Sequence, residues 1–193
     1  MSPAAGSLFA VFRLTPGRVI VVLIVLLGVS LAAFNVWFRY ATTNKIHDRW
    51  GTEAMLRIAE APEASWWELE PPGNRPASAA GELDAIVFSG QVYSIRKRGD
   101  LITARGFVNL RYALGQNGSY DFSRGDSPTI EWRWAMIFDA DGKRTVVLVD
   151  EDFRWLLAFD TATTKPIGNP LVRLTEKMAA GLKTFFEEQR AAK

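Results

Sequence analysis

The stretch that decides the fold is TIEWRWAMIFDADGKRTVVLVDEDFRWLLAFD, residues 129–160. Its first part alternates between two sets of residues, Trp132, Trp134, Met136 and Phe138 against Glu131, Arg133, Ala135 and Ile137. A period of two predicts a β-strand with one face directed to a core, and Asp141-Gly142 predicts a hairpin turn. Residues 146–149 then form the partner strand, and FRWLLAF, residues 153–159, continues as a third strand.

The segment before this stretch extends the domain. LDAIVFSGQVYSI, residues 83–95, is rich in β-branched and aromatic residues, which favour strands. Residues 100–118, DLITARGFVNLRYALGQNG, predict a helix with Asp100 as its cap and GQNG as its stop. Four apolar residues in it have helical spacing: Ile102, Phe107, Leu110 and Leu114.

A further helix is predicted at the C-terminus. Asn169 is a favourable N-cap, and Pro170 suits the first helical position. One apolar face follows, formed by Leu171, Leu174, Met178, Leu182 and Phe185. Together these signals predict an α+β fold, in which an N-terminal transmembrane helix precedes one antiparallel sheet of about four strands packed against two or three helices.

The N-terminal region carries an uncharged apolar run, VIVVLIVLLGVSLAAFNVWF, from Val19 to Phe38. About 20 residues in a helix cross a hydrocarbon core of about 30 Å. A cleaved signal peptide is the alternative, with SLA ending at Ala32 as the small-residue cleavage site. The apolar run continues beyond that site to Phe38, which favours an uncleaved anchor.

The chain therefore divides into five expected segments. They are an N-terminal tail (1–18), a transmembrane helix (19–38), a membrane-proximal helical stem (39–70), a loop or linker (71–82) and the α+β domain (83–193). The stem has a helical apolar stripe that is interrupted at Gly51 and stops before Pro62. The linker PPGNRPASAAGE consists of proline, glycine, small and polar residues with little to bury.

Charge and composition exclude several classes of function. The chain has 23 basic and 21 acidic residues, and Arg13 and Arg18 are the only charged residues before Arg39. The body from Arg39 onward thus has 21 of each sign and lacks the basic footprint of a nucleic-acid-binding protein. Because the sequence has no cysteine, disulfides, thiolate catalysis and cysteine-ligated metals are excluded.

The basic residues give a nearly balanced signal for membrane orientation. Arg13 and Arg18 precede the apolar run, whereas Arg39, Lys45 and Arg49 follow it. A short basic tail kept inside the cell, with the domain exported, is the arrangement that we favour.

The strongest candidate for chemistry is the acidic corner, Asp150 to Asp152. Neighbouring carboxylates can bind a hard cation or divide acid and base roles, but acids are also common in turns, where they accept hydrogen bonds from amides. His47, the single histidine, lies in the stem without a partner that the sequence identifies. We therefore assign no catalytic, cofactor-binding or metal-ligating residue and expect no cofactor.

Two further features have competing interpretations. The triplet RGD occurs at residues 98–100 and 124–126, where it is either an adhesive motif or ordinary turn chemistry. Trp66 and Trp67 are adjacent, and the sequence leaves open whether they pack in the core or contact a partner.

The order of three motifs resembles a group of small single-pass bacterial membrane proteins with no known activity. The motifs are RWGTEAMLRIAEAPE, ARGFVNLRYALGQNGSYDF and WRWAMIF. The resemblance covers the chain from about residue 20 onward, implies a bacterial membrane protein, and transfers no functional residue. We expect the protein in the cytoplasmic membrane.

These observations lead to two hypotheses of function. The first is a membrane-anchored, non-enzymatic binding or scaffold module that contacts the bilayer through residues 19–38. Its sheet and tryptophans meet a protein partner or the membrane surface. The alternative is a membrane-anchored hydrolase that uses Asp150 and Asp152. The two differ in geometry, because an enzyme requires Asp150 or Asp152 to line a cavity beside a second polar group.

Overall fold

The structure is a computed structural model that describes residues 16–71, 85–123, 129–161 and 166–191. It divides into two compact units, Met1–Ala41 and Thr42–Lys193. The described part of the first unit is the beginning of helix α1 (Pro16–Trp50). Its side chains are exposed from Pro16 to Ala41, and its apolar part has a mean hydropathy of 2.8. The helix predicted for residues 19–38 is confirmed, and it is long and apolar enough to cross a bilayer.

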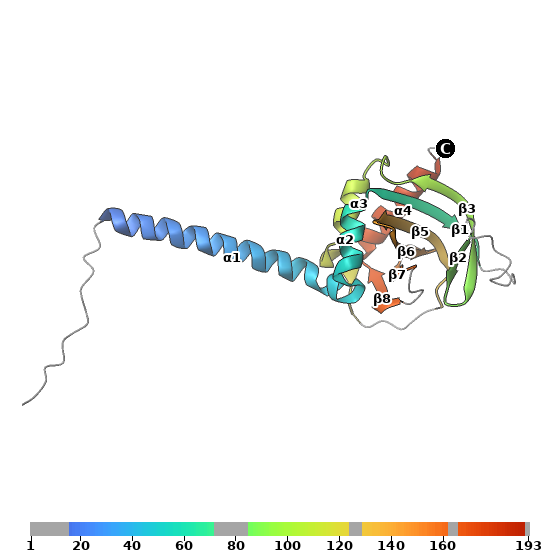
Figure 1. Cartoon of the computed structure of the whole chain (residues 1–193), viewed down its shortest axis with the longest axis horizontal. Coiled ribbons are helices and arrows are strands. Elements are labelled where there is room, and N and C mark those ends of the chain that lie inside the picture. Colours follow the sequence, from blue (N-terminus) through green and yellow to red (C-terminus); the bar gives the residue numbers. More distant parts are fainter. Residues whose placement is uncertain (1–15, 72–84, 124–128, 162–165, 192–193) are drawn as a thin grey trace, which may run out of the picture. The chain divides into compact units, whose positions relative to one another are not determined.

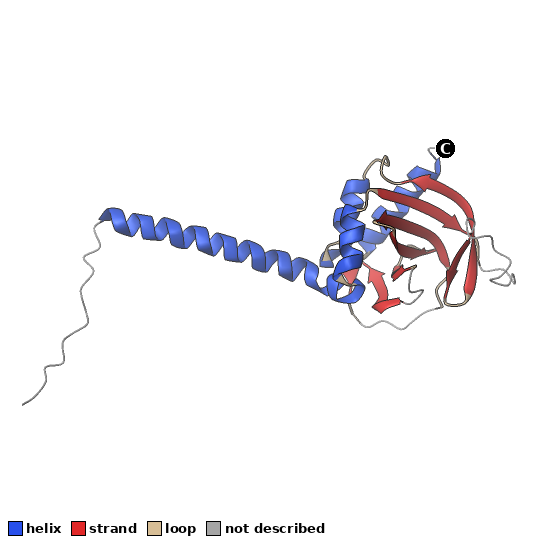
Figure 2. Ribbon diagram, viewed as in Figure 1, coloured by secondary structure: helices blue, strands red, loops and turns tan. Residues whose placement is uncertain are grey.

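The second unit contains one antiparallel sheet, with eight strands among the described residues, in the order β2-β3-β1-β5-β6-β7-β8-β4 (Figures 1 and 2). The strands are β1 (Glu63–Leu69), β2 (Ala85–Phe88), β3 (Gln91–Asp100), β4 (Tyr120–Asp121), β5 (Trp132–Ala140), β6 (Lys143–Asp150), β7 (Trp155–Asp160) and β8 (Pro166–Leu174). The prediction of one antiparallel sheet is confirmed, but the prediction of about four strands is wrong.

The β5–β6 hairpin forms as the sequence predicts. Its turn places Asp141 and Gly142 at φ values of 52° and 72°, the left-handed conformation that glycine and aspartate tolerate best. Ala140 pairs with Lys143 directly before and after the turn. This hairpin lies at the centre of the sheet, between β1 and β7.

Apolar residues cover both faces of the central strands and form two separate cores. One core contains Trp134, Met136 and Phe138, and the other contains Ala135 and Ile137. Trp132 belongs to the second core although Trp134 belongs to the first, because the register of β5 shifts between them. The expected alternation of one buried and one exposed face is therefore wrong for β5.

The second core closes because the sheet curls over it. Phe88 of β2 lies 5.0 Å from Phe159 of β7, measured between ring centroids, although β3, β1, β5 and β6 separate these strands in the sheet. Strongly curved sheets of this kind bury their concave face without needing a helix.

Helices cover the first core (Figure 2). They are the end of α1, α2 (Thr52–Glu60), α3 (Phe107–Leu114) and α4 (Glu176–Ala191). Ile46 and Trp50, in the part of α1 that belongs to the second unit, are fully buried. Helix α2 is fixed across the sheet by Arg57, which donates to Thr145 Oγ1 at 2.8 Å and to Asp160 Oδ2 at 3.0 Å.

Most of the segment expected to be a helical stem, residues 39–70, belongs to the second unit, which begins at Thr42. The helix break at Gly51 and the helix end at Glu60 occur as predicted. Residues 63–69, however, form β1, which pairs with β3 on one side and β5 on the other. A single strand without a hairpin signal gives little local evidence, so its pairing with distant strands was not predictable from its own sequence.

Two predicted helix starts are wrong. Strand β3 continues to Asp100, and α3 begins only after Gly106, whose φ is 85°. The carboxylate of Asp100 instead accepts hydrogen bonds from the amides of Ile102 and Thr103 in a turn. Asp100 thus accepts hydrogen bonds from backbone amides, as an N-cap residue does, but in a turn and not at the start of a helix.

The C-terminal helix begins later than predicted. Residues 166–174 form β8, in which Leu156 and Leu157 of β7 pair with Val172 and Leu171. Helix α4 starts at Glu176, and Thr175 Oγ1 accepts a hydrogen bond from the amide of Met178. The pairing of β8 with β7 therefore overrides the helix-start signal of Asn-Pro at residues 169–170. The predicted linker, apart from Pro71, and the second RGD triplet lie outside the described residues.

Trp66 packs in the first core and is 1% exposed, so of the two alternatives for this residue the core position is the one observed. Its ring contacts Trp134 and Phe186, at 5.9 and 6.4 Å between centroids. A Cβ atom built on Gly99 of β3 would lie 2.3 Å from Trp66 Nε1. The first RGD triplet is therefore part of β3, and its glycine makes room for Trp66.

We expect Gly99→Ala to destabilise the protein because the added methyl group overlaps the Trp66 ring. Overpacking of this kind costs about 1–3 kcal/mol or more. Chemical unfolding of the full chain in detergent measures it. Gly118→Ala is the matched control, since a Cβ there meets nothing within 4 Å. Equal stability of the two variants would contradict the close approach of Gly99 and Trp66.

Candidate functional site

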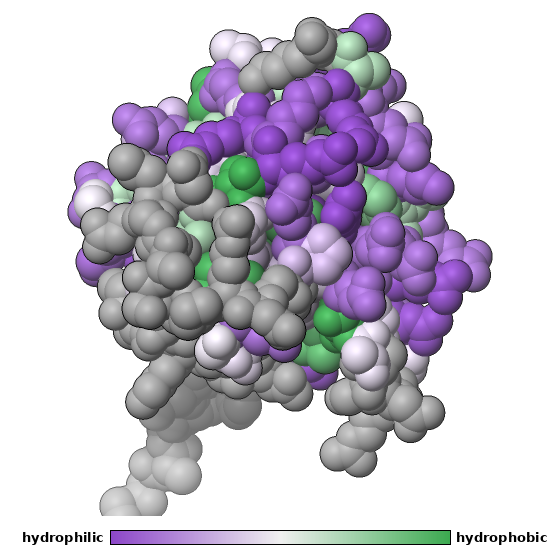
Figure 3. Space-filling view, turned by 90° about the vertical axis from the view of Figure 1, so that its right-hand side faces the viewer, coloured by the Kyte–Doolittle hydropathy of each residue, from purple (hydrophilic) through white to green (hydrophobic). Residues whose placement is uncertain are grey.

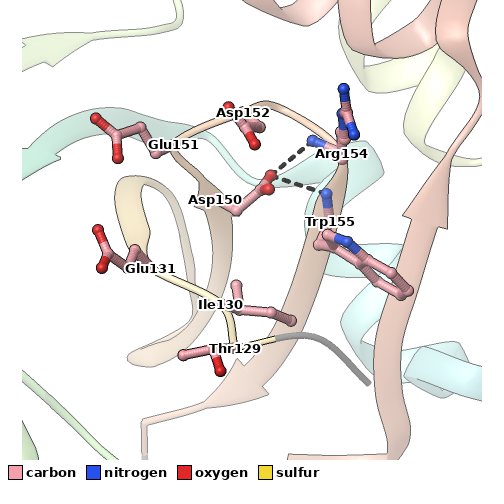
Figure 4. A pocket seen from close by; sticks show the side chains of 8 residues that line it. All are labelled: Thr129, Ile130, Glu131, Asp150, Glu151, Asp152, Arg154 and Trp155. Carbon is pink, nitrogen blue, oxygen red and sulfur yellow. Dashed lines mark hydrogen bonds between the residues drawn. The ribbon is translucent and has the colours of Figure 1, made fainter. Parts of the chain in front are cut away.

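The acidic corner lines a cavity of about 340 Å³ at the end of β6 (Figure 4). Its lining residues are Thr129, Ile130, Glu131, Asp150, Glu151, Asp152, Arg154 and Trp155. The structure thus brings the predicted candidates Asp150 and Asp152 together with a further acid, Glu131. This is the cavity with neighbouring polar groups that the hydrolase hypothesis requires.

Asp150 also has a structural role in this corner. Its Oδ1 accepts hydrogen bonds from the amides of Arg154 at 2.6 Å and Trp155 at 2.8 Å (Figure 4). Asp150 is 7% exposed, whereas Glu151 and Asp152 are exposed. Glu151 points to the opposite side of the loop from Asp150. The corner is therefore held by Asp150, which closes the turn between β6 and β7.

The electrostatics of Asp150 reflect these surroundings. Burial raises the pKa of Asp150 above its ordinary value of 3.8, and the charge of Asp152 acts in the same direction. The two amide hydrogen bonds act against this shift because they stabilise the carboxylate. A raised pKa in a cavity is typical of an acid catalyst, but it also follows from burial of a turn residue.

Among the described residues, no three histidine or acidic side chains lie close enough together to hold a metal ion. His47 is half-buried in the last turns of α1 and lines none of the cavities described here.

A second concave region, the Trp67 groove, crosses the ends of β1, β3, β5 and β6. Its main part measures about 700 Å³, and an adjoining part of about 450 Å³ shares Pro62, Glu63, Asp139 and Arg144 with it. The main part is lined by Pro62, Glu63, Ala64, Ser65, Trp67, Arg98, Gly99, Asp100, Ile102, Asp139 and Arg144. The groove is therefore larger than the cavity at the acidic corner.

Trp67 is half-buried in this groove and has two guanidinium groups beside its ring. The central carbon of Arg98 lies 5.6 Å from the ring centroid, and that of Arg144 lies 5.8 Å from it. Asp139 accepts two hydrogen bonds from Arg144, at 2.8 and 3.0 Å, which fixes that guanidinium in place and raises its pKa. The two adjacent tryptophans thus differ, since Trp66 closes the core and Trp67 lines a groove.

Large exposed hydrophobic residues are few on the described surface of the second unit. Figure 3 shows the side that carries β2 and β3, where hydrophilic residues predominate and the hydrophobic areas are small and separate. The large exposed hydrophobic residues of the second unit are Leu56, Val87, Ile102, Val108 and Tyr112. They are distributed over α2, β2, α3 and the turn before α3. Ile102 is the one that also lines the groove.

Sequence reasoning found the acidic corner but missed the groove. Trp67, Arg98 and Arg144 are separated in sequence and meet only because β1 pairs with β3 and β5. The signal that was available is the pair of tryptophans itself, since adjacent residues of a strand face opposite sides of the sheet.

Comparison with known proteins does not assign the chain to a family. No protein-family model, no curated protein and no solved structure matches it significantly.

The role of Asp150 predicts different effects for two substitutions. Asp150→Ala removes the acceptor of two amides and should cost about 1–3 kcal/mol of stability at neutral pH. Asp150→Asn keeps an acceptor oxygen and removes the buried charge, so it should cost much less. Urea unfolding of the full chain and both variants in detergent measures this.

The unsubstituted protein and Asp150→Asn should also differ in how their stability depends on pH. Because the pKa of Asp150 is raised in the folded state, the contribution of Asp150 to the free energy of unfolding is largest below the ordinary value of 3.8 and decreases as the pH rises through the folded pKa. The hydrogen bonds from the amides of Arg154 and Trp155 remain above that pH. The stability of Asp150→Asn relative to the unsubstituted protein should therefore increase between about pH 3 and about pH 7. Equal losses for the Asn and Ala variants at pH 7 would contradict this role.

Proposed function

We propose that the protein is a single-pass membrane protein whose domain binds a segment of a partner protein in the Trp67 groove, without catalysing a reaction. The observation that carries this proposal is the half-buried Trp67 ring with two arginines beside it in a cavity of about 700 Å³. Tryptophan and arginine, together with tyrosine, are the residues most enriched at the energetic centres of protein interfaces.

The charges of the groove support a peptide-like partner. Arg98 and Arg144 lie beside Glu63, Asp100 and Asp139, so both signs are present. Asp139 already fixes Arg144, which reduces the entropy lost when a ligand binds. A polypeptide segment supplies donors, acceptors and apolar groups together, whereas a nucleic acid would require a basic surface.

The membrane part of the proposal rests on α1. The apolar run from Val19 to Phe38 continues past the small residues that a signal peptidase would need, and its side chains are exposed. An exposed apolar helix of this length is stable in a bilayer. We place the protein in the cytoplasmic membrane of a bacterium, with the domain on the extracytoplasmic side.

A second candidate function is a membrane-anchored hydrolase that uses Asp150 and Asp152. The observation that favours it is the cavity at the acidic corner, in which burial raises the pKa of Asp150. Activity assays of the full chain with ester, glycoside and phosphoester substrates test this hypothesis. Hydrolysis that is lost in Asp150→Asn, with the fold retained, would replace the binding proposal.

The binding proposal is tested by photo-crosslinking in native membranes that have been washed with carbonate to remove peripheral proteins. One photoreactive side chain replaces Ile102, which is 43% exposed and lines the groove. The other replaces Tyr112, which is 70% exposed and lies on α3. We expect a discrete crosslinked partner from position 102.

Substitutions in the groove provide the decisive comparison. Trp67→Ala should reduce crosslinking at position 102 by about tenfold, the effect typical of an interface hot spot. Arg98→Gln should also reduce it, with less risk to the core because Arg98 is exposed. The proposal fails if neither substitution changes the crosslink at position 102, or if both change crosslinks at position 112 equally.

A further inference from the structure

Three arginines surround one buried carboxylate, Glu68 of β1. The side chain of Glu68 is 2% exposed, and its Oε1 lies 3.2 Å from Arg190 Nη2, 3.7 Å from Arg133 Nη2 and 4.0 Å from Arg96 Nη1. The arginines come from α4, β5 and β3. We call Arg96, Arg133 and Arg190 the arginine triad. Two strands and a helix that are distant in sequence thus direct cations to one atom.

Glu68 does not satisfy the hydrogen-bonding groups of these arginines. Within the described residues its Oε1 accepts no hydrogen bond, so the 3.2 Å approach of Arg190 is a misaligned ion pair. Arg144, in contrast, makes two hydrogen bonds to Asp139. A guanidinium has five N–H donors. The triad therefore holds many donors around an acceptor that takes none of them.

The local charge is also unbalanced. Three positive charges face one negative charge, and Lys97 is adjacent, since its Nζ donates to the backbone oxygen of Arg190 at 2.8 Å. Arg96 and Arg190 are 54% and 51% exposed, whereas Glu68 is buried beneath them. The carboxylate thus lies on the protein side of the cluster, and the excess positive charge lies on the solvent side.

The backbone is irregular at this cluster. The β1–β3 register shifts between Glu68 and Leu69, and the β5–β6 register shifts between Trp132 and Trp134, at Arg133. Glu68 pairs with Trp134 across β1 and β5, so the two irregularities are neighbours. Bulges redirect side chains and are enriched beside functional sites.

We propose that the arginine triad binds a phosphate group. All three nitrogens lie within 4.0 Å of one oxygen, so no two are more than about 8 Å apart, a span that one phosphate bridges with charge-assisted hydrogen bonds of about 2.8 Å. The planar fork of arginine matches phosphate oxygens in two-point contacts. Lys97 adds a further cation beside Arg190.

Glu68 is a positioning residue in this site. Its negative charge lies on the protein side of the three guanidinium groups. Without this counter-charge their mutual repulsion would keep the three groups apart. The site belongs to the helix-covered side of the sheet, because Glu68 follows Trp66 in the alternation of β1 and Arg190 belongs to α4. It is therefore distinct from the Trp67 groove, which opens on the opposite side of β1.

Titration of inorganic phosphate into the full chain in nonionic detergent, followed by calorimetry at fixed ionic strength, tests the proposal. Arg96→Gln combined with Arg190→Gln should weaken phosphate binding at least about tenfold, since two charge-assisted contacts are lost. Arg105→Gln combined with Arg173→Gln is the matched control, because both residues are exposed, lie outside the triad and line none of the cavities described above. Equal affinity of the two double variants would overturn the proposal.

Glu68→Gln separates phosphate binding from a purely structural role of the cluster. Removal of the counter-charge leaves the guanidinium groups to repel one another, so the variant should have a lower unfolding temperature and gain more from added phosphate than the unsubstituted protein. If Glu68 only fastens α4 to the sheet, phosphate at constant ionic strength would not restore the lost stability. That result would also overturn the proposal.

The source of the phosphate is distinguished in nanodiscs. In discs of phosphatidylcholine with added phosphatidylglycerol, loss of inorganic phosphate binding relative to phosphatidylcholine alone would identify a lipid headgroup as the ligand. Unchanged binding in the two kinds of disc would identify a soluble phosphate compound. Both arms require the triad, so a signal that persists in Arg96→Gln with Arg190→Gln would contradict the site.

Discussion

The rest of the structure depends on the pairing of β1 with β3 and β5. In the sequence, β1 follows the apolar helix after two short helical segments. It nevertheless lies inside the sheet and has hydrogen-bonded neighbours on both sides. It places Trp66 in the helix-covered core, Trp67 in the groove and Glu68 beneath the arginine triad. Because successive residues of a strand face opposite sides, one short segment supplies residues to both candidate sites.

The chain that follows the apolar helix belongs to the folded domain from Thr42 onward. Ile46 and Trp50 are buried, and Arg57 fastens α2 to β6 and β7 before β1 begins. The segment from residue 42 to residue 69 therefore contributes to the cores and cannot be removed as a spacer. A ligand that contacts Trp67 or the triad would act on the strand that is closest in sequence to the proposed anchor.

The sequence predicted local features well and long-range pairing poorly. The β5–β6 hairpin was predictable because its alternation and its Asp-Gly turn are local signals, and the break at Gly51 was predictable for the same reason. Strands β1 and β8 were missed because their stability comes from partners far away in sequence, which also overrode the helix start at Asn169 and Pro170. The acidic corner was found as a run of carboxylates, but its role in closing a turn depends on the amides of Arg154 and Trp155. The groove and the triad have no local signature, since each combines residues from several strands.

The most direct test of this account is amide hydrogen exchange in the full chain, because it measures whether residues 64–68 belong to the sheet. We predict that the amides of Trp66 and Trp67 are as strongly protected as those of Val147 and Leu148 in β6. Rapid exchange at Trp66 and Trp67, with protection retained in β6, would show that this segment is a stem outside the domain and would contradict the account.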